Sequence, residues 1–122
     1  MKIAIVGSRS VTVDNIGDYI SKEDEIVSGG AKGADRCAAN YARQNGCKLT
    51  EFFPEYERYG RAAPIKRNHT IVDYADKVIV FWDGRSKGTL SVIQYARKIG
   101  KPCEVIFCGV GIDESGGKLP LP

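Results

Sequence analysis

The chain has 122 residues, of which 43% are hydrophobic and 27% are charged, and its formal net charge at pH 7 is +3. This length and composition predict one globular domain with a core of its own. So small a positive charge gives no reason to expect a nucleic-acid partner. The apolar run at the amino terminus is too short for a signal peptide, and no run reaches membrane-spanning length. We therefore expect a cytoplasmic protein with no membrane partner.

The cysteines do not form a metal-ligand pattern. None of the four lies in a Cys-x-x-Cys pair, and the single histidine, His69, is remote from them in the sequence. We expect reduced thiols with structural roles and no dedicated metal site.

Short apolar segments alternate with helical patterns along the chain. The predicted strands cover residues 2–6, 25–27, 49–53, 77–82 and 104–108. The first and fourth are continuous apolar runs, which are typical of strands buried on both faces.

Four helices are predicted between these strands, at residues 14–22, 31–45, 64–75 and 89–99. In the second helix, small side chains recur at helical spacing, and Gly46 stands where a left-handed C-cap belongs. Pro64 occupies the first turn of the third, a favoured place for proline. The alternation predicts a three-layer α/β domain over residues 1–108, with a mostly parallel sheet of about five strands and helices on both faces. Residues 109–122 form a tail rich in glycine and proline.

Two glycine-rich stretches stand where a predicted strand passes into a helix. Residues 28–35 read SGGAKGAD and residues 83–89 read DGRSKGT. With residues 7–9 and the segment before Pro64, they should emerge at the carboxyl edge of the sheet, where such folds bind ligands. The free N–H groups of a helix's first turn attract anions, and Lys32 and Lys87 could each add a positive charge.

Neither stretch fits a Walker A loop or the dinucleotide fingerprint G-x-G-x-x-G. One such loop alone is weak evidence, because a tight, closely packed strand-to-helix turn explains it more readily. Two on successive crossovers at one sheet edge favour a ligand site.

Three polar residues have both a structural and a functional interpretation. Asn68 is predicted on the same helix face as Ile65 and Val72, so its amide must cap a backbone group or reach a ligand. Arg67 is either a phosphate-binding fork or a solvated surface residue. Asp35 either complements the helix dipole or accepts hydrogen bonds from ribose hydroxyls. Phe81 and Trp82 are expected in the core, although an aromatic ring at that rim could stack on a base.

These residues resemble a known superfamily. Residues 28–35 are similar to the S-G-G-A-x-G-x-D signature of DNA-processing protein A, and residues 84–89 to the G-G-x-x-G-T motif of the "lonely guy" phosphoribohydrolases. Both belong to the SLOG superfamily of Rossmann-like domains. The YspA-like, YpsA-related branch resembles the chain most, through the opening I-V-G-S-R, Pro54, residues 60–63, Arg67-Asn68 and Asp76.

The resemblance implies a nucleotide-like ligand held between the two glycine motifs, and self-association as a homodimer or larger homo-oligomer. No cofactor is expected to be required, and Mg²⁺ is possible as a companion of the phosphate, although no dedicated ligand cluster supports it. The ligand contacts it implies are Gly7, Ser8, Arg9, Gly29, Gly30, Lys32, Gly33, Asp35, Arg67, Asn68, Gly84, Lys87, Gly88 and Thr89.

One departure from the family pattern bears on activity. The phosphoribohydrolases carry a glutamate in the turn after Gly-Thr, whereas Thr89 is followed here by Leu-Ser-Val. A sensor or binding module is therefore favoured. The alternative is a phosphoribohydrolase that cleaves nucleoside monophosphates with another carboxylate, Asp35 or Asp83. Single-stranded DNA binding is disfavoured because the Lys and Arg residues are scattered.

Overall fold

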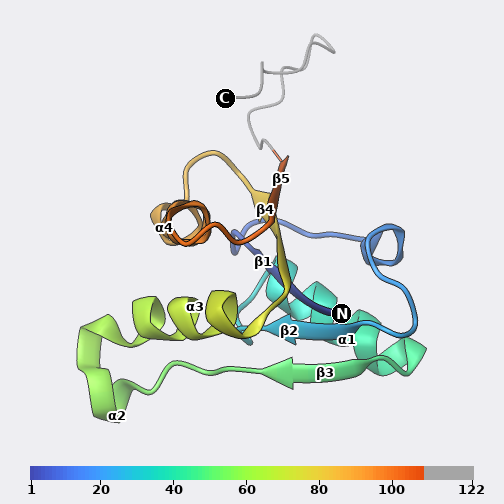
Figure 1. Ribbon diagram of the computed structural model, residues 1–122, viewed down its shortest axis with the longest axis horizontal. Coiled ribbons are helices and arrows are strands. Elements are labelled where there is room, and N and C mark those ends of the chain that lie inside the picture. The colour runs from blue at the N-terminus through green and yellow to red at the C-terminus, as the bar shows by residue number, and fades with distance from the viewer. Residues whose placement is uncertain (109–122) are drawn as a thin grey trace, which may run out of the picture.

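The computed structural model describes residues 1–108, and the predicted tail lies outside these residues. Five strands form one sheet in the order β3-β2-β1-β4-β5 (Figure 1). All four pairings are parallel, which confirms the predicted α/β class with a parallel sheet. The strands are β1 (Lys2–Gly7), β2 (Glu25–Ser28), β3 (Lys48–Glu51), β4 (Lys77–Trp82) and β5 (Cys103–Phe107).

Helices cover both faces of this sheet. α1 (Ala34–Asn45) lies on one face, and α3 (Ala63–Tyr74) and α4 (Lys87–Lys98) pack on the other. A short helix, α2 (Tyr56–Tyr59), and a 3₁₀ turn, η2 (Gly60–Ala62), connect β3 to α3. The sequence patterns did not predict these two short elements.

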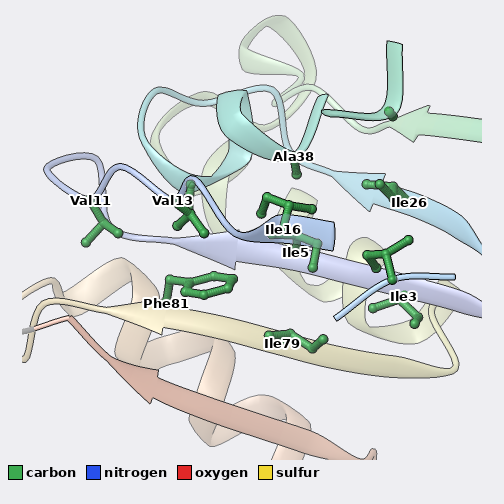
Figure 2. Packing of buried hydrophobic residues seen from close by; sticks show 12 residues of the cluster. Ile3, Ile5, Val11, Val13, Ile16, Ile26, Ala38, Ile79 and Phe81 are labelled. Carbon is green, nitrogen blue, oxygen red and sulfur yellow. The ribbon is translucent and has the colours of Figure 1, made fainter. Parts of the chain in front are cut away.

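The two faces of β1 build two separate cores. Ile3 and Ile5 point to the α1 side, and Ala4 and Val6 point to the α3 and α4 side, because side chains alternate along a strand. On the first side, Figure 2 shows side chains of β1, β2 and β4 gathered beneath Ala38 and the segment that follows β1. Burial on both faces explains why β1 reads as an uninterrupted apolar run.

The predicted helix over residues 14–22 is wrong. Only a single 3₁₀ turn, η1 (Ile16–Asp18), forms there, although Val13, Ile16 and Ile20 are buried as expected. Glycine disfavours a helix interior, and a Cβ at Gly17 would lie 2.9 Å from the Tyr41 hydroxyl. The segment therefore lies as an irregular strap against the α1 side of the core.

Helix boundaries follow from backbone conformations. α1 starts at Ala34 and not at residue 31, because Gly33 has a φ of +79° that no helix accommodates. It ends as predicted at Gly46, a left-handed C-cap with a φ of +70°. Of the helices in residues 1–108, none is long and apolar enough to cross a membrane.

Candidate functional site

A cleft of about 250 Å³ opens at the carboxyl edge of the sheet. All four segments expected at this edge contribute to its wall. The lining residues are Val6, Gly7, Arg9, Ala31, Asp35, Tyr56, Pro64, Arg67, Asn68, Ser86, Gly88, Thr89 and Val92. The four segments meet here because parallel strands all end at the same edge of the sheet, and each strand is followed there by a loop.

The first glycine-rich loop, between β2 and α1, is bonded largely to itself. The Gly29 amide donates to the Asp35 carboxylate at 3.1 Å, and the Gly30 amide donates to the Ser28 hydroxyl at 3.3 Å. The Ser28 hydroxyl in turn donates to the Asp35 carbonyl at 3.2 Å. A Cβ at Gly33 would collide with the Ser8 carbonyl oxygen and lie 2.7 Å from that of Arg9. Glycine is thus required here for close backbone packing.

Asp35 is a buried carboxylate, with only 4% of its surface exposed. Burial raises its pKa from 3.8 to about 6, although the charge of Arg67 and the amides of Ala31, Gly29 and Gly7 oppose the rise. Its Oδ2 is already an acceptor for the loop. Asp35 therefore fixes the loop and also presents a carboxyl group to the cleft wall.

Arg67 links α3 to this loop. Its Nη1 donates to the Gly29 carbonyl at 2.5 Å, and its Nε donates to the Asn68 side-chain oxygen at 2.8 Å. The second bond turns the Asn68 amide nitrogen away from Arg67, and that nitrogen has no acceptor among residues 1–108. Burial lowers the pKa of Arg67, while the nearby Asp35 carboxylate works in the opposite direction. The guanidinium stays charged because arginine is not deprotonated in proteins.

Asn68 lies on the apolar stripe of α3 for a reason that the helix pattern alone does not reveal. The first turns of α3 border the cleft at the sheet edge, so Pro64 and Asn68 face the cleft, while Ile71 and Val72 reach the core. Ile65 is 50% exposed, which corrects the expectation that it faces the sheet.

Asp83 organises the second glycine-rich loop, between β4 and α4. Its carboxylate accepts the amides of Arg85 and Ser86, both at 2.8 Å, and the Ser10 hydroxyl at 3.0 Å. Burial alone would raise the pKa of Asp83, but the Ser86 and Arg85 amides outweigh it and lower the pKa. An ionised carboxylate so fully engaged with the loop is a poor substitute for a catalytic glutamate.

The start of α4 leaves backbone donors open toward the cleft. Ser86 caps the helix, and its hydroxyl accepts the Thr89 amide at 3.2 Å. The amides of Lys87 and Gly88 have no acceptor within residues 1–108, and a Cβ at Gly88 would meet nothing within 4 Å. Open first-turn amides together with the helix dipole form an anion site.

The residues implied by the family resemblance fall into three groups. Those that line the cleft are Gly7, Arg9, Asp35, Arg67, Asn68, Gly88 and Thr89. Those that support its wall from behind are Ser8, Gly29 and Gly33. Those that are exposed and do not line the cleft are Gly30, Lys32, Gly84 and Lys87, although the Lys87 backbone lies between the lining residues Ser86 and Gly88.

Tyr56 lines the cleft although no sequence pattern singled it out. Its only signal was its place in the segment before Pro64, which was expected at this edge. The aromatic pair considered for stacking lies elsewhere. Phe81 is buried in the core, and Trp82 borders a separate groove of about 340 Å³ beside β5.

Part of the chain matches a known protein family. Residues 1–59 match the family described as YspA, cpYpsA-related SLOG family. No curated protein matches the chain. The matched segment contains the β1–η1 loop and the first glycine-rich loop, and it indicates nucleotide-related binding or processing as the general class of function. The match over residues 1–59 confirms the resemblance of this part of the chain to the SLOG superfamily, in its YspA, cpYpsA-related family.

Proposed function

We propose that the cleft binds a nucleotide or nucleotide-derived small molecule and that the protein acts as a sensor or binding module. The phosphate would bind at the open amides of Lys87 and Gly88, with Arg9 and Arg67 supplying positive charge. This arrangement of backbone donors and guanidinium groups in one cleft is the observation that carries the proposal.

The charge distribution supports an anionic ligand. Arg9 is exposed at the cleft, and no carboxylate within residues 1–108 forms a salt bridge with it. The Nη2 of Arg67 has no acceptor in the same part of the chain, whereas its other nitrogens hold the loop. Both groups are thus available to a phosphate without loss of an internal ion pair.

The alternative proposal, a phosphoribohydrolase, depends on Asp35. Asp83 is engaged by its own loop, and Asp35 is the remaining carboxylate that lines the cleft. An enzyme of this kind would release free base from a nucleoside monophosphate, which chromatography detects, and Asp35→Asn would abolish the release. If no free base is released from any of the four nucleoside monophosphates, the phosphoribohydrolase alternative is wrong and the binding-module proposal remains.

We further propose self-association, at least as a homodimer, which the family resemblance implies. We also propose a cytoplasmic location and no required cofactor, with Mg²⁺ only as a companion of the phosphate. Light scattering of the purified chain tests the first, since a monomer at all concentrations would contradict it.

The binding test is titration calorimetry with AMP, GMP, CMP and UMP. Arg9→Ala should weaken binding about tenfold or more, as expected for the loss of a charge-assisted hydrogen bond. Arg36→Ala is the matched control. It removes the same charge as Arg9→Ala, but Arg36 is exposed on α1 and does not line the cleft. Failure of all four nucleotides to bind at millimolar concentration would overturn the proposal.

A further inference from the structure

Tyr56 is the one tyrosine within residues 1–108 whose side chain is mostly exposed. The sequence contains six tyrosines. The other five are partly buried: Tyr19 packs on Phe81, Tyr74 on Phe52, Tyr95 on His69 and Tyr41 on the α1-side core, and Tyr59 lies beneath Arg58 and Lys66. The ring of Tyr56 makes no aromatic or cation–π contact within residues 1–108, and its hydroxyl makes no hydrogen bond there, although it lies near enough to Arg67 to interact with it electrostatically.

This exposed ring lies at the cleft. Tyr56 is 59% exposed and still belongs to the cleft lining. In Figure 1, α2 and the start of α3 lie on the side toward which β2 and β3 point, which is the side of the ligand edge. An exposed aromatic ring costs free energy in water, so a ring kept at a ligand cleft indicates contact with an apolar or aromatic part of the ligand.

The surroundings of Tyr56 fit the base half of a nucleotide. Tyr56, Pro64 and Asn68 come from the α2–α3 segment, whereas the open amides of the proposed phosphate site come from α4. Asn68 adds free amide N–H donors on the same segment, and such donors suit the acceptor atoms at a base edge. Tyrosine rings stack on bases of every kind, because each base has a π face.

Resting on the proposed function, we infer that Tyr56 is the platform on which the base of the nucleotide stacks. The site then selects a phosphate that carries a base over a bare sugar phosphate. The phosphate binds at α4 and the base lies against α2, so the ligand spans the cleft from one segment to the other.

The test compares AMP with ribose 5-phosphate, which lacks the base. Tyr56→Ala should weaken AMP binding about 5- to 150-fold, the range for one stacked base, and leave ribose 5-phosphate within about twofold. Tyr56→Phe keeps the ring and should bind AMP like the wild type. Tyr59→Ala is the matched control, since Tyr59 lies on the same short helix but does not line this cleft.

A spectroscopic readout separates stacking from a structural role. In proton NMR, the base H2 and H8 resonances of bound AMP should shift upfield through the ring current of Tyr56, and this shift should disappear in Tyr56→Ala. If wild type binds AMP and Tyr56→Ala binds it equally well, the inference is overturned and the proposed function stands. An equal loss of AMP and ribose 5-phosphate also overturns it. If wild type binds neither probe nor any other nucleoside monophosphate, both the inference and the proposed function are wrong.

Discussion

The two glycine-rich loops have similar sequences, but their backbone amides differ in whether they are already hydrogen-bonded within the protein. In the β2–α1 loop, the amides of Gly29 and Gly30 already donate to protein oxygens, and Gly33 fits tightly against the carbonyls that follow β1. In the β4–α4 loop, the Gly88 amide has no acceptor within residues 1–108, and open space surrounds its Cα. The first loop is a clamp that shapes the cleft, and the second presents donors to it.

The carboxylates of the two loops differ in the same sense. Asp35 is buried at the cleft wall with a raised pKa, whereas Asp83 accepts three hydrogen bonds and has a lowered pKa. A glycine-rich turn at a sheet edge therefore does not by itself identify a phosphate site. What matters is whether its N–H groups are already bonded and whether a Cβ would find space.

The largest expected effect is on the clamp. Gly33→Ala places a Cβ against the backbone carbonyls of Ser8 and Arg9 and forces alanine into a φ of +79°. Overpacking and backbone strain each cost up to about 3 kcal/mol, so we expect the free energy of unfolding to fall by about 3 kcal/mol or more. Urea denaturation followed by circular dichroism measures the loss.

Gly46→Ala separates strain from collision in that experiment. Gly46 has a similar φ of +70° at the end of α1, but a Cβ there meets nothing within 4 Å. Its cost should be only the left-handed penalty, about 1 kcal/mol. Equal losses in the two variants would show that Gly33 is not closely packed and that the clamp interpretation is wrong.

The next largest effect is on the pH dependence of the free energy of unfolding, which should have opposite signs for the carboxylates of the two loops. Asp35 has a higher pKa folded than unfolded, so the folded state binds its proton more tightly, and wild type should gain stability relative to Asp35→Asn as the pH falls from 7 to 4. The rise from 3.8 to about 6 corresponds to roughly 3 kcal/mol at most. Denaturation midpoints over this pH range report the gain.

Asp83→Asn supplies the opposite case for the same measurement. The pKa of Asp83 is lowered in the folded state, so its ionised form stabilises the fold, and this contribution disappears as the pH falls through 3.8 and below. Wild type should therefore lose stability relative to Asp83→Asn in that acid range. The same sign for both variants would contradict the assignment of one carboxylate to desolvation and the other to hydrogen bonding.

Sequence patterns predicted the sheet and its ligand edge because both depend on local, repetitive signals. Continuous apolar runs identified β1 and β4, and alternation with helices required parallel crossovers whose loops meet at one edge. The false helix over residues 14–22 arose from the spacing of Val13, Ile16 and Ile20, which a strap lying flat on the core satisfies equally well.

The division of roles within the site could not be predicted in this way. Glycine content shows where a backbone can approach closely, but not whether the partner is a ligand or the Ser8 carbonyl. The raised pKa of Asp35 arises from burial by segments distant in sequence. Tyr56 is distinctive because its ring is exposed at the cleft while the other five tyrosines are partly buried, a property of the folded chain.

The smallest expected change in stability is also the sharpest test of the open loop. Gly88→Ala replaces a helical glycine whose Cβ would meet nothing within 4 Å, so the variant should be as stable as wild type or about 0.5–1 kcal/mol more stable. The new methyl group would occupy the space that a phosphate needs near the Lys87 and Gly88 amides. We therefore expect AMP affinity to fall about tenfold or more, a loss of about 1.4 kcal/mol, while the melting temperature without ligand stays level or rises.

Ser91→Ala is the control for this variant. Ser91 is also on α4 but outside the cleft lining, so its substitution should change neither AMP affinity nor the melting temperature. In Gly88→Ala, stability and AMP affinity should therefore move in opposite directions. If Gly88→Ala keeps full AMP affinity, the phosphate binds elsewhere in the cleft, and the β4–α4 loop is not the loop that presents donors to it.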